Sequence, residues 1–368
     1  MKVLHVISGD LWAGAEVQAS TLLGALTRQP GIEVAAALMN EGELARHLRA
    51  LGISVSVFPE SELGAAALVS ALRRLMKSWR PDVVHTHRTK ENILACIANL
   101  LAGNAASVRT AHGADEIAPG AGLHGMRHRL LRALDRFCGN HLQHRIISVS
   151  EELSTRLALH FPRDRIVTVE NGIDAAAVRA RIAPIPFRAD DPGGVHVGIV
   201  GRMVAVKRVD LFLEMARHLP EAEPARAWRF HVFGDGPLLA SLRTRASALG
   251  IDGKTTFYGH RDDIVACLAG LDVLVICSDH EGLPMTLLEA AAVGTPVAAH
   301  AVGGMTRVIE ECRAGLAVTE HTPEGYARAV RELTKRSRPA GYIASRYDAD
   351  HNAREIAGVY RAALAAAG

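Results

Sequence analysis

The residues best suited to chemistry lie in the segment 279–290, which follows the Val-rich run 272–277. Pro284 falls where a helix would begin, and proline suits a first helical turn because the N–H that it lacks would have no helical partner there. The N–H groups of such a helix start carry partial positive charge and bind anions. The segment therefore predicts an anion site formed by the backbone N–H groups of Leu283, Met285 and Thr286.

Glu281 and Glu289 flank this expected helix start, one in the loop before it and one on its second turn. A single acidic residue near a helix N-terminus is explained by capping alone. Two acidic residues on either side of a helix-starting proline favour a binding site.

Two cations, Arg202 and Lys207, follow the strand-like run 195–200 and its closing Gly201. Arginine offers a planar fork and lysine a point charge, so together they could clamp a diphosphate. A solvated basic loop is the alternative, and the position directly after a strand favours the clamp.

The loop 8–16, Ser-Gly-Asp-Leu-Trp-Ala-Gly-Ala-Glu, joins the first strand-like run to a helix. Its glycines do not match the spacing G-x-G-x-x-G, which disfavours a nicotinamide dinucleotide. Gly14 would let the backbone approach a phosphate or a sugar hydroxyl, and a tight turn without a ligand is the alternative.

Three histidines stand where strands end. His85 and His87 close the fourth strand-like run, and His112 closes the fifth beside Gly113. Most histidines in such runs are structural or solvated. His112 is the candidate for function, because ligands of α/β proteins bind at the carboxyl ends of the strands.

The elements that position these residues alternate between strand-like and helical periodicity. The expected strands are residues 2–7, 33–38, 54–58, 82–86, 107–111, 145–149, 195–200, 229–233, 255–258, 272–277 and 296–299. The expected helices are residues 16–27, 43–51, 63–79, 92–101, 126–141, 209–219, 237–249, 264–268, 284–293 and 349–366. This alternation predicts an α/β protein of two Rossmann-like domains with a ligand in the cleft between them.

The domain boundaries follow from where the pattern restarts. We expect an N-terminal domain over residues 1–180, completed by the last helix, a Pro- and Gly-rich linker over 181–194, and a C-terminal domain over 195–348.

Composition narrows the class of protein. Of the 368 residues 49% are hydrophobic and 22% charged, with a net charge of +3, which is ordinary for a globular protein and too weakly basic for a dedicated nucleic-acid binder. The five cysteines form no C-x-x-C pair, and no apolar run is long enough to span a membrane. We therefore expect a cytoplasmic protein without disulfides or a zinc site.

Residues 126–145 combine basic and apolar side chains at helical spacing. The basic ones are Arg127, His128, Arg129, Arg132, Arg136, His141, His144 and Arg145, against the single acid Asp135. The apolar ones are Leu130, Leu131, Leu134, Phe137 and Leu142. A core-packed helix with a solvated basic face is the commoner arrangement, and weak, reversible association with an anionic membrane is the alternative.

Several short motifs occur in a fixed order along the chain. In the second half they are Asn171-Gly172-Ile173-Asp174, Gly201-Arg202 with Lys207, Phe233-Gly234-Asp235-Gly236-Pro237, Tyr258-Gly259, Glu281-Gly282-Leu283-Pro284 with Glu289-Ala290, and Ala301-Val302-Gly303-Gly304. In the first half they are Ala13-Gly14-Ala15-Glu16, Pro81-Asp82-Val83-Val84-His85 and Thr110-Ala111-His112-Gly113. The ordered set resembles the retaining glycosyltransferases of family 4, whose GT-B fold has two facing Rossmann-like domains with a central cleft.

The resemblance implies a role for each candidate residue. Arg202 and Lys207 would hold the diphosphate of a nucleotide-activated sugar without a metal, Glu289 would bind the ribose, and Glu281 would face the sugar. His112 would approach the sugar from the N-terminal domain. The remaining donor-side contacts would come from Gly14, Gly234, Gly259, Gly282, Leu283, Met285 and Thr286.

The chain departs from the family pattern at two places. Met305-Thr306 follows Gly303-Gly304 where the family has Pro-Glu, and Ala13 replaces the first glycine of the N-terminal loop. The first departure puts the packing of the donor site in doubt, and the second weakens the assignment of the N-terminal loop. All four charged residues of the expected site are present.

We therefore expect retaining transfer of a hexose-type sugar to a glycan or lipid-linked acceptor in cell-surface polysaccharide or glycolipid biosynthesis. A UDP-sugar is the first choice of donor, with GDP- and ADP-sugars as alternatives, and no other cofactor is required. A nucleotide-sugar epimerase or hydrolase of the same fold, or a non-catalytic nucleotide-sugar-binding partner, are the competing hypotheses. The base, sugar, acceptor, linkage and oligomeric state do not follow from the sequence.

Overall fold

The computed structural model describes residues 1–10, 12–113 and 122–368, with the side chains of residues 122–128 left out of the description. Leu11 of the predicted ligand loop, and the side chains of Arg127 and His128 of the predicted basic helix, therefore lie outside the described residues. The chain divides into two compact units. Unit 1 comprises Met1–Gly172 and Arg346–Gly368, and unit 2 comprises Ile173–Ser345.

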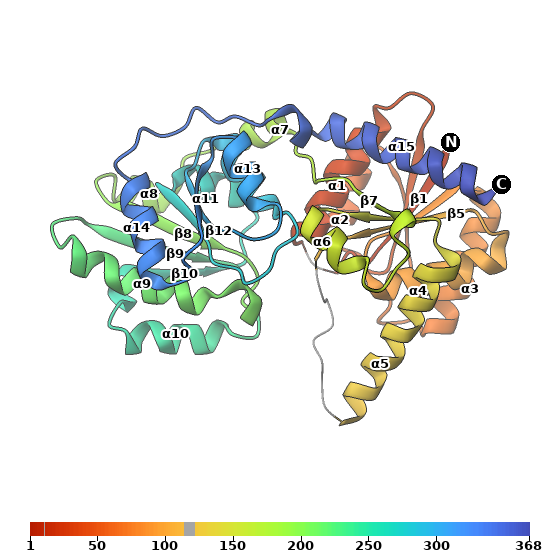
Figure 1. The fold of residues 1–368 in the computed structure, drawn as a ribbon, viewed down its shortest axis with the longest axis horizontal. Helices are drawn as coiled ribbons and strands as arrows, with labels where there is room; N and C mark the ends of the chain where they lie inside the picture. The colour runs from red at the N-terminus through yellow and green to blue at the C-terminus, as the bar shows by residue number, and fades with distance from the viewer. Residues whose placement is uncertain (11, 114–121) are drawn as a thin grey trace. The chain divides into compact units, whose positions relative to one another are not determined.

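Unit 1 is built on a seven-stranded parallel sheet in the order β3-β2-β1-β4-β5-β6-β7. Its strands are β1 Lys2–Ile7, β2 Glu33–Leu38, β3 Ser54–Val57, β4 Val83–Thr86, β5 Ala106–Ala111, β6 Arg145–Ser148 and β7 Ile166–Thr168. Its helices are α1 Gly14–Thr27, α2 Glu43–Ala50, α3 Ala65–Trp79, α4 Thr89–Ala102, α5 Gly122–Phe137, α6 Glu151–Leu157 and α15 Ala349–Ala367. A short π-helical turn, Cys138–Leu142, extends α5. The central strands are buried on both faces because helices cover the sheet on both sides (Figure 1).

Unit 2 repeats the plan with a six-stranded parallel sheet in the order β10-β9-β8-β11-β12-β13. Its strands are β8 Val195–Val200, β9 Trp228–Phe233, β10 Thr255–Gly259, β11 Val273–Ile276, β12 Val297–His300 and β13 Gly315–Val318. Its helices are α7 Ala175–Arg179, α8 Pro186–Asp190, α9 Val209–Ala222, α10 Leu239–Ala248, α11 Ile264–Gly270, α12 Met285–Val293, α13 Met305–Glu311 and α14 Pro323–Leu333.

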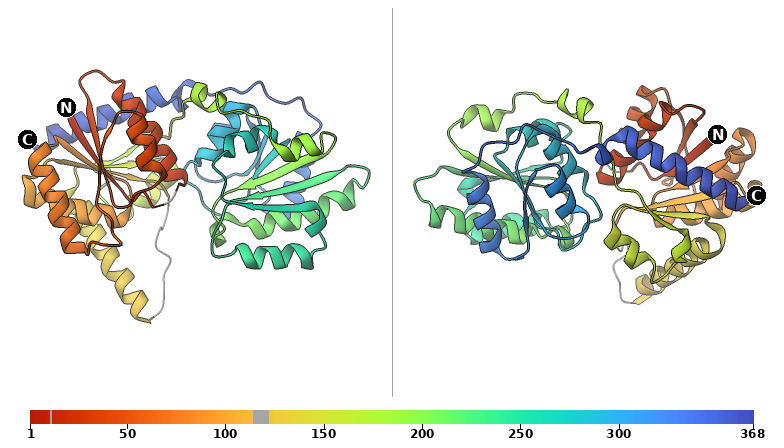
Figure 2. Two further views of the ribbon diagram at one scale, coloured as in Figure 1. Left: turned by 180° about the vertical axis from the view of Figure 1, so that it is seen from behind. Right: turned by 45° about the horizontal axis from the view of Figure 1, so that its top comes forward.

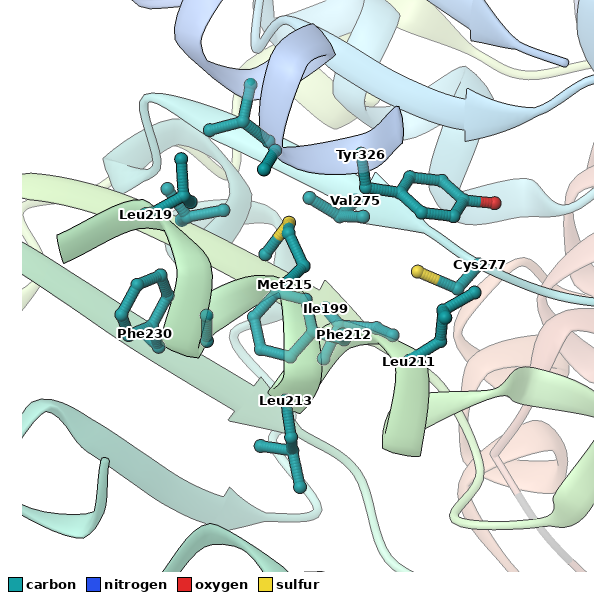
Figure 3. Close-up of a cluster of buried hydrophobic side chains, with 14 of the residues drawn as sticks. Ile199, Leu211, Phe212, Leu213, Met215, Leu219, Phe230, Val275, Cys277 and Tyr326 are labelled. Carbon is teal, nitrogen blue, oxygen red and sulfur yellow. The ribbon is translucent and has the colours of Figure 1, made fainter. Parts of the chain in front are cut away.

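The core of unit 2 lies between α9, α14 and the sheet. Phe212 and Met215 of α9 pack with Phe230 of β9 and Val275 of β11, and all four side chains are fully buried (Figure 3). Burial of one such side chain contributes about 1.5–3 kcal/mol. This packing holds the strands rigidly, and with them the loops that follow the strands.

The last helix returns to unit 1. Asp348 caps α15 by accepting hydrogen bonds from the backbone N–H groups of Asp350 and His351. Ile356 and Tyr360 then pack into the core beside α1 and the strands, fully buried. In the views of Figure 2 the two chain ends, one on β1 and one on α15, both belong to this unit.

Strand order reverses once in each sheet, between β1 and β4 in unit 1 and between β8 and β11 in unit 2. The loops after these neighbouring strands turn to opposite faces of the sheet, which leaves a crevice where ligands of doubly wound folds bind. The crevice of unit 2 is flanked by the loop after β8 and the loop after β11, and these loops carry Arg202, Lys207 and Glu281.

The expected strands and helices are observed, with ends that differ by a few residues. Two strands, β7 and β13, were not expected, because one is three residues long and the other begins with a glycine. The unexpected helices are α6, α7, α8, α13 and α14. The start of α14 carries a clear signal, since Thr322 caps it through the N–H of Gly325 and Pro323 is its first residue.

The region predicted as a linker is part of unit 2. The boundary between the units falls between Gly172 and Ile173, before the expected position at residue 180. Within 181–194, Pro186 begins the short helix α8, and Phe187 packs against His231 with 4.2 Å between ring centroids. The prolines of this segment are typical of a linker, but Pro186 instead starts a packed helix.

Candidate functional site

The crevice of unit 2 brings together two of the predicted charges. Lys207 Nζ donates to Glu281 Oε1, and the Ser278 hydroxyl donates to the same oxygen at 2.6 Å. The Glu281 side chain is 12% exposed and that of Lys207 26%, so this ion pair is partly shielded from water. The two residues are separated by 74 positions in sequence and meet because β8 and β11 are neighbours.

Two glycine contacts hold the surrounding loops at fixed distances. A Cβ on Gly303, which has φ +60°, would lie 2.1 Å from the carbonyl oxygen of Glu281. A Cβ on Gly234 would lie 2.0 Å from the carbonyl oxygen of Gly201, and the Gly234 N–H donates to the Gly259 carbonyl at 2.7 Å. Gly234 and Gly259 thus join the loops after β8, β9 and β10 through the backbone, which is a positioning role distinct from the predicted ligand contact.

The N-terminus of α12 lies in the same crevice. Pro284 is its cap residue in an extended conformation, and Met285 and Thr286 are the first two helical residues. Their N–H groups have no intrahelical acceptor by the geometry of a helix start. The side chains of Leu283 and Met285 are buried, so any contact from them to a ligand is through the backbone. Gly282 supplies its carbonyl to the Gly304 N–H at 2.9 Å.

Arg202 differs from Lys207 in its surroundings. Its side chain is exposed and makes no hydrogen bond or ion pair with the residues that the structure describes. It is therefore the more readily available cation of the predicted pair, whereas Lys207 must exchange or share Glu281 to meet an anion.

Glu289 is buried at 4% exposure on α12. Burial raises the pKa of its carboxyl group to about 7, against an opposing effect of the Arg181 charge. Its carboxylate has no hydrogen-bond partner among the described residues. A buried carboxyl group that is costly to ionise and lacks a protein partner is suited to accept hydrogen bonds from a ligand.

A second charged network in unit 2 was missed from sequence. Arg208 Nη1 donates to Asp279 Oδ1 at 3.0 Å, and the same oxygen lies 3.0 Å from His321 Nε2. His321 also contacts the hydroxyl of Tyr326 at 2.9 Å. The network ties the loop after β8 to the loop after β11. Asp279 lies within the predicted segment 279–290, but its partner His321 is remote in sequence, so the network could not be predicted.

In unit 1, His112 ends a chain of buried hydrogen bonds. His85 Nε2 lies 2.8 Å from Thr110 Oγ1, and His85 Nδ1 lies 2.7 Å from the Tyr360 hydroxyl. That hydroxyl lies 3.2 Å from His5 Nε2, and His5 Nδ1 lies 3.0 Å from His87 Nε2. His87 Nδ1 then lies 3.2 Å from His112 Nε2.

Burial keeps these rings neutral. It lowers the pKa of His5, His85 and His87 well below the usual range, and neighbouring rings lower it further. The pKa of His112 falls to about 3, through burial first and then through the charges of Arg88 and Arg109. A neutral ring has one donor and one acceptor nitrogen, so the direction of one bond fixes the direction of the next.

The buried end of the chain sets that direction. Thr110 is 1% exposed, and its hydroxyl has no acceptor other than His85 Nε2 in the described part of the chain. Leaving that hydroxyl hydrogen unpaired would cost about 1–3 kcal/mol. Thr110 therefore donates to His85, and the bonds run in one direction from there to His112. His87 Nδ1–H donates to His112 Nε2, and His112 presents its Nδ1–H outward.

The hydrogen bonds of these histidines also bear on metal binding. Among the described residues, His5, His85 and His87 are grouped closely enough to hold an ion. Both ring nitrogens of each already have partners within the hydrogen-bonded chain. The arrangement fits a hydrogen-bonded relay better than a metal site.

The start of α1 is joined to the loop after β4. Glu16 is fully buried and accepts a bond from Arg88 Nη2 at 2.6 Å, and burial raises its pKa against the effect of Arg88. A Cβ on Gly14 would meet nothing within 4 Å, so the first residue of α1 faces open space. Arg88 and Arg109 were missed from sequence. Their signal was a charged residue in or directly after a buried strand.

Comparison with known proteins identifies the family. Residues 12–177 match the family described as Glycosyltransferase Family 4, and residues 194–336 match the one described as Glycosyl transferases group 1. The chain belongs to the family 4 glycosyltransferases.

Two curated relatives illustrate the range of the family. Over 72% of its length the chain is 28% identical to the 2-deoxystreptamine N-acetyl-D-glucosaminyltransferase of Streptomyces fradiae, and it covers 65% of that protein. Over 58% of its length it is 31% identical to the D-inositol 3-phosphate glycosyltransferase of Rhodococcus opacus, and it covers 50% of that protein. The chain thus spans between half and two thirds of the length of these relatives.

Solved structures share the fold. The structure of Anabaena Alr3699/HepE in complex with UDP and glucose matches with a TM-score of 0.78 at 20% identity, over 98% of this chain and 99% of that one. WaaG, a glycosyltransferase involved in lipopolysaccharide biosynthesis, matches with a TM-score of 0.68 at 17% identity, over 100% of this chain and 98% of that one. The two Rossmann-like units of this glycosyltransferase are of the GT-B type.

The buried carboxyl group of Glu289 generates a prediction on stability. The folded-state pKa of Glu289 is about 7, against an ordinary value of 4.5. The free energy of unfolding is therefore unaffected by this group below about pH 4.5, where the carboxyl group is protonated in both states, and it falls as the pH rises through about 7. At about 1.4 kcal/mol per pKa unit the loss is roughly 3 kcal/mol. We expect Glu289→Gln to melt at a higher temperature relative to the wild type at pH 8 than at pH 5. A difference in melting temperature that does not change with pH would contradict the assignment.

The chain of hydrogen bonds predicts the tautomer of His112. Long-range ¹H–¹⁵N spectra near neutral pH should show His112 protonated at Nδ1, with His112→Gln used to assign its signals. Tyr360→Phe interrupts the chain in its middle and should produce a mixture of His112 tautomers. A wild-type ring protonated at Nε2 would mean that the hydrogen bonds run in the opposite direction, and it would refute the prediction.

Proposed function

We propose that this glycosyltransferase moves a hexose-type sugar from a nucleotide-diphosphate sugar to a glycan or lipid-linked acceptor, with retention of anomeric configuration. The observation that carries the proposal is the crevice of unit 2. There Lys207 and Glu281 pair beside the N-terminus of α12, and the exposed Arg202 lies in the same loop as Lys207. A site with two cations, a helix start and a carboxylate fits an anionic leaving group attached to a hydroxyl-bearing sugar.

The diphosphate is assigned to the two cations. Arg202 supplies a fork of donors and Lys207 a point charge, and both stabilise the negative charge that develops on the leaving phosphate. This assignment supports catalysis without a metal ion. The complexes of Alr3699/HepE with UDP and with UDP-glucose favour a UDP-sugar, with GDP- and ADP-sugars as alternatives.

The acidic residues take separate parts of the donor. Glu289 accepts hydrogen bonds from the ribose hydroxyls, because its buried carboxylate has no hydrogen-bond partner within the described part of the chain. Glu281 faces the transferred sugar, and His112 donates to it from Nδ1. The departing phosphate assists removal of the acceptor proton on the same face of the sugar, so that configuration is retained.

Two other functions would use the same crevice. An epimerase or hydrolase would consume the nucleotide sugar without an acceptor, and a non-catalytic partner would bind it without turnover. The presence of Arg202, Lys207, Glu281 and Glu289 together favours the transferase over the non-catalytic partner. Release of free sugar in the absence of an acceptor would favour the hydrolase.

We also propose weak membrane association through α5. No helix among the described residues is long and apolar enough to cross a bilayer. The side chains of Leu130, Leu134 and Phe137 are 60%, 38% and 55% exposed at helical spacing, which departs from the core-packed alternative. Leu131 packs inward beside Ile93 and Cys138. Figure 1 shows α5, in yellow, extending away from the rest of unit 1. An exposed apolar strip on a basic helix suits the interface of an anionic membrane.

The role of Lys207 predicts a loss of turnover. Lys207→Ala should lower kcat by about a hundred- to a thousand-fold, the effect of removing one group that stabilises developing charge. The melting temperature should change little, since Ser278 still donates to Glu281. Lys254→Ala removes an exposed lysine elsewhere in unit 2 and serves as the matched control. Turnover of the Lys207→Ala protein near that of the control would refute the role, and Lys207→Arg separates charge from shape.

The exposed strip of α5 predicts sedimentation with vesicles. Vesicles that contain phosphatidylglycerol should carry down more protein than pure phosphatidylcholine vesicles at low salt, and the difference should shrink at high salt. Phe137→Ser should reduce the bound fraction, whereas Leu51→Ser, at an exposed leucine outside α5, should not. Equal sedimentation with both kinds of vesicle would favour a soluble acceptor.

A further inference from the structure

Two histidines of unit 2 lie against each other at the carboxyl edge of the sheet. His300 is the last residue of β12, and His321 lies in the loop between β13 and α14. Their rings are stacked, with 3.8 Å between the ring centroids and an angle of 12° between the ring planes. Neither residue belongs to the predicted donor site, but both contact the segment that leads from β11 to Glu281.

His300 holds the backbone of that segment. Its Nδ1 lies 2.8 Å from the carbonyl oxygen of Ser278. A carbonyl oxygen only accepts hydrogen bonds, so Nδ1 of His300 carries the hydrogen and donates it. Ser278 is 1% exposed, and its hydroxyl donates to Glu281 Oε1 at 2.6 Å. His300 is thus joined to the Glu281 carboxylate through a single residue.

His321 holds the side chain of the next residue, Asp279. Nε2 of His321 lies 3.0 Å from Asp279 Oδ1, and its Nδ1 lies 2.9 Å from the hydroxyl of the fully buried Tyr326. Burial opposes the ionisation of Asp279, but hydrogen bonds from His321 and Arg208 lower its pKa overall. Asp279 therefore accepts as a carboxylate, and Nε2 of His321 carries the donated hydrogen. The Tyr326 hydroxyl fixes the ring from its other nitrogen.

A backbone contact shows which loop these bonds position. The Asp279 N–H donates to the carbonyl of Val206 at 2.9 Å, which places the loop after β11 against the residue before Lys207. The main chain and side chain of Asp279 are therefore tied to two different loops, and the carbonyl of Ser278 is tied to the end of β12. These contacts orient the chain two residues before Glu281.

We propose that His300 and His321 are positioning residues for the donor site, which hold the segment 278–281 so that Glu281 faces the transferred sugar. The role toward the sugar rests on the proposed function, whereas the hold on the segment does not. The two rings act through different nitrogens, Nδ1 in His300 and Nε2 in His321. The amide nitrogen of asparagine is as many bonds from Cβ as Nδ1 of histidine, and that of glutamine is as many bonds from Cβ as Nε2. Each position should therefore tolerate a different amide.

The first measurement is amide hydrogen exchange over the segment 278–284 in the whole protein without ligand. His300→Asn and His321→Gln keep the donated hydrogen bond and should exchange like the wild type. His300→Gln and His321→Asn lose it and should exchange about five- to tenfold faster, the effect of losing one hydrogen bond. His218→Asn and His218→Gln, at a partly exposed histidine of α9, are the matched controls and should both exchange like the wild type. Equal exchange of the asparagine and glutamine variants at either His300 or His321 overturns the proposal.

A second measurement needs no variant to fold. Burial lowers the pKa of His300, so its ring is neutral near neutral pH and has one protonated nitrogen. Long-range ¹H–¹⁵N spectra of the wild type should show His300 protonated at Nδ1. Protonation at Nε2 alone would mean that His300 does not donate to Ser278, and it would overturn the proposal.

Calorimetry with UDP-glucose and with UDP connects the segment to the sugar. His300→Gln and His321→Asn should bind UDP-glucose about tenfold more weakly than the wild type and UDP with unchanged affinity, because the contact of Glu281 with the sugar is lost while the cations remain. Wild-type affinity of both variants for UDP-glucose overturns the positioning of Glu281. A wild-type protein that binds no UDP-glucose overturns the proposed donor instead, and the exchange experiment then decides by itself whether the two histidines hold the segment.

Discussion

Parallel pairing of β8 with β11 is the constraint on which the donor side of this protein depends. Val273 lies opposite Val197 in the sheet, although β9, β10 and three helices separate these strands along the chain. Because the carboxyl ends of parallel strands meet at one edge, the loops after β8 and β11 become neighbours. Lys207 then reaches Glu281. Gly234 packs against the Gly201 carbonyl in the loop after β8, and Gly303 packs against the Glu281 carbonyl in the loop after β11, so each loop is also held by a neighbouring one.

The electrostatics of this crevice suit a site that must accept a highly charged ligand. Lys207 is balanced by Glu281 when no ligand is bound, while Arg202 stays exposed to water. Glu289 is held in a buried position that makes its ionised form unfavourable. Such local costs are typical of functional sites, where binding rather than stability decides the residue. The fully packed core around Phe212 and Phe230 offsets them.

Unit 1 keeps a row of histidines neutral next to several arginines. Burial removes water from His5, His85 and His87, and hydrogen bonds to one another, to Tyr360, to Thr110 and to His112 satisfy their nitrogens instead. The row begins at a buried threonine and ends at His112, so the packing of β1, β4, β5 and α15 controls which nitrogen of His112 carries its proton.

Local sequence determined much of this architecture. The alternation of Val-rich runs and helical periodicity predicted eleven of the strands and the doubly wound class, and the ordered motifs placed Lys207, Glu281 and Glu289 in one candidate site. These signals are local, because periodicity and helix starts depend on residues within a few turns of each other. The sequence did not predict the short strands β7 and β13 or the helix within residues 181–194, because elements of so few residues carry almost no periodic signal.

Only the tertiary structure decided which distant residues meet. Nothing near His112 in sequence indicates that Tyr360 orients it through His5 and His87, because that chain requires α15 to pack against β4 and β5 with Tyr360 reaching His5 of β1. The sequence showed a basic helix at residues 126–145, but the packing of α5 placed Arg132 and Arg136 at the wall of one cavity with Arg109 and Arg156, while Leu130 and Leu134 stay exposed. The charge pattern along one helix can be predicted from the spacing of its residues in sequence. The partners of those charges come from other elements, so only the three-dimensional fold determines them.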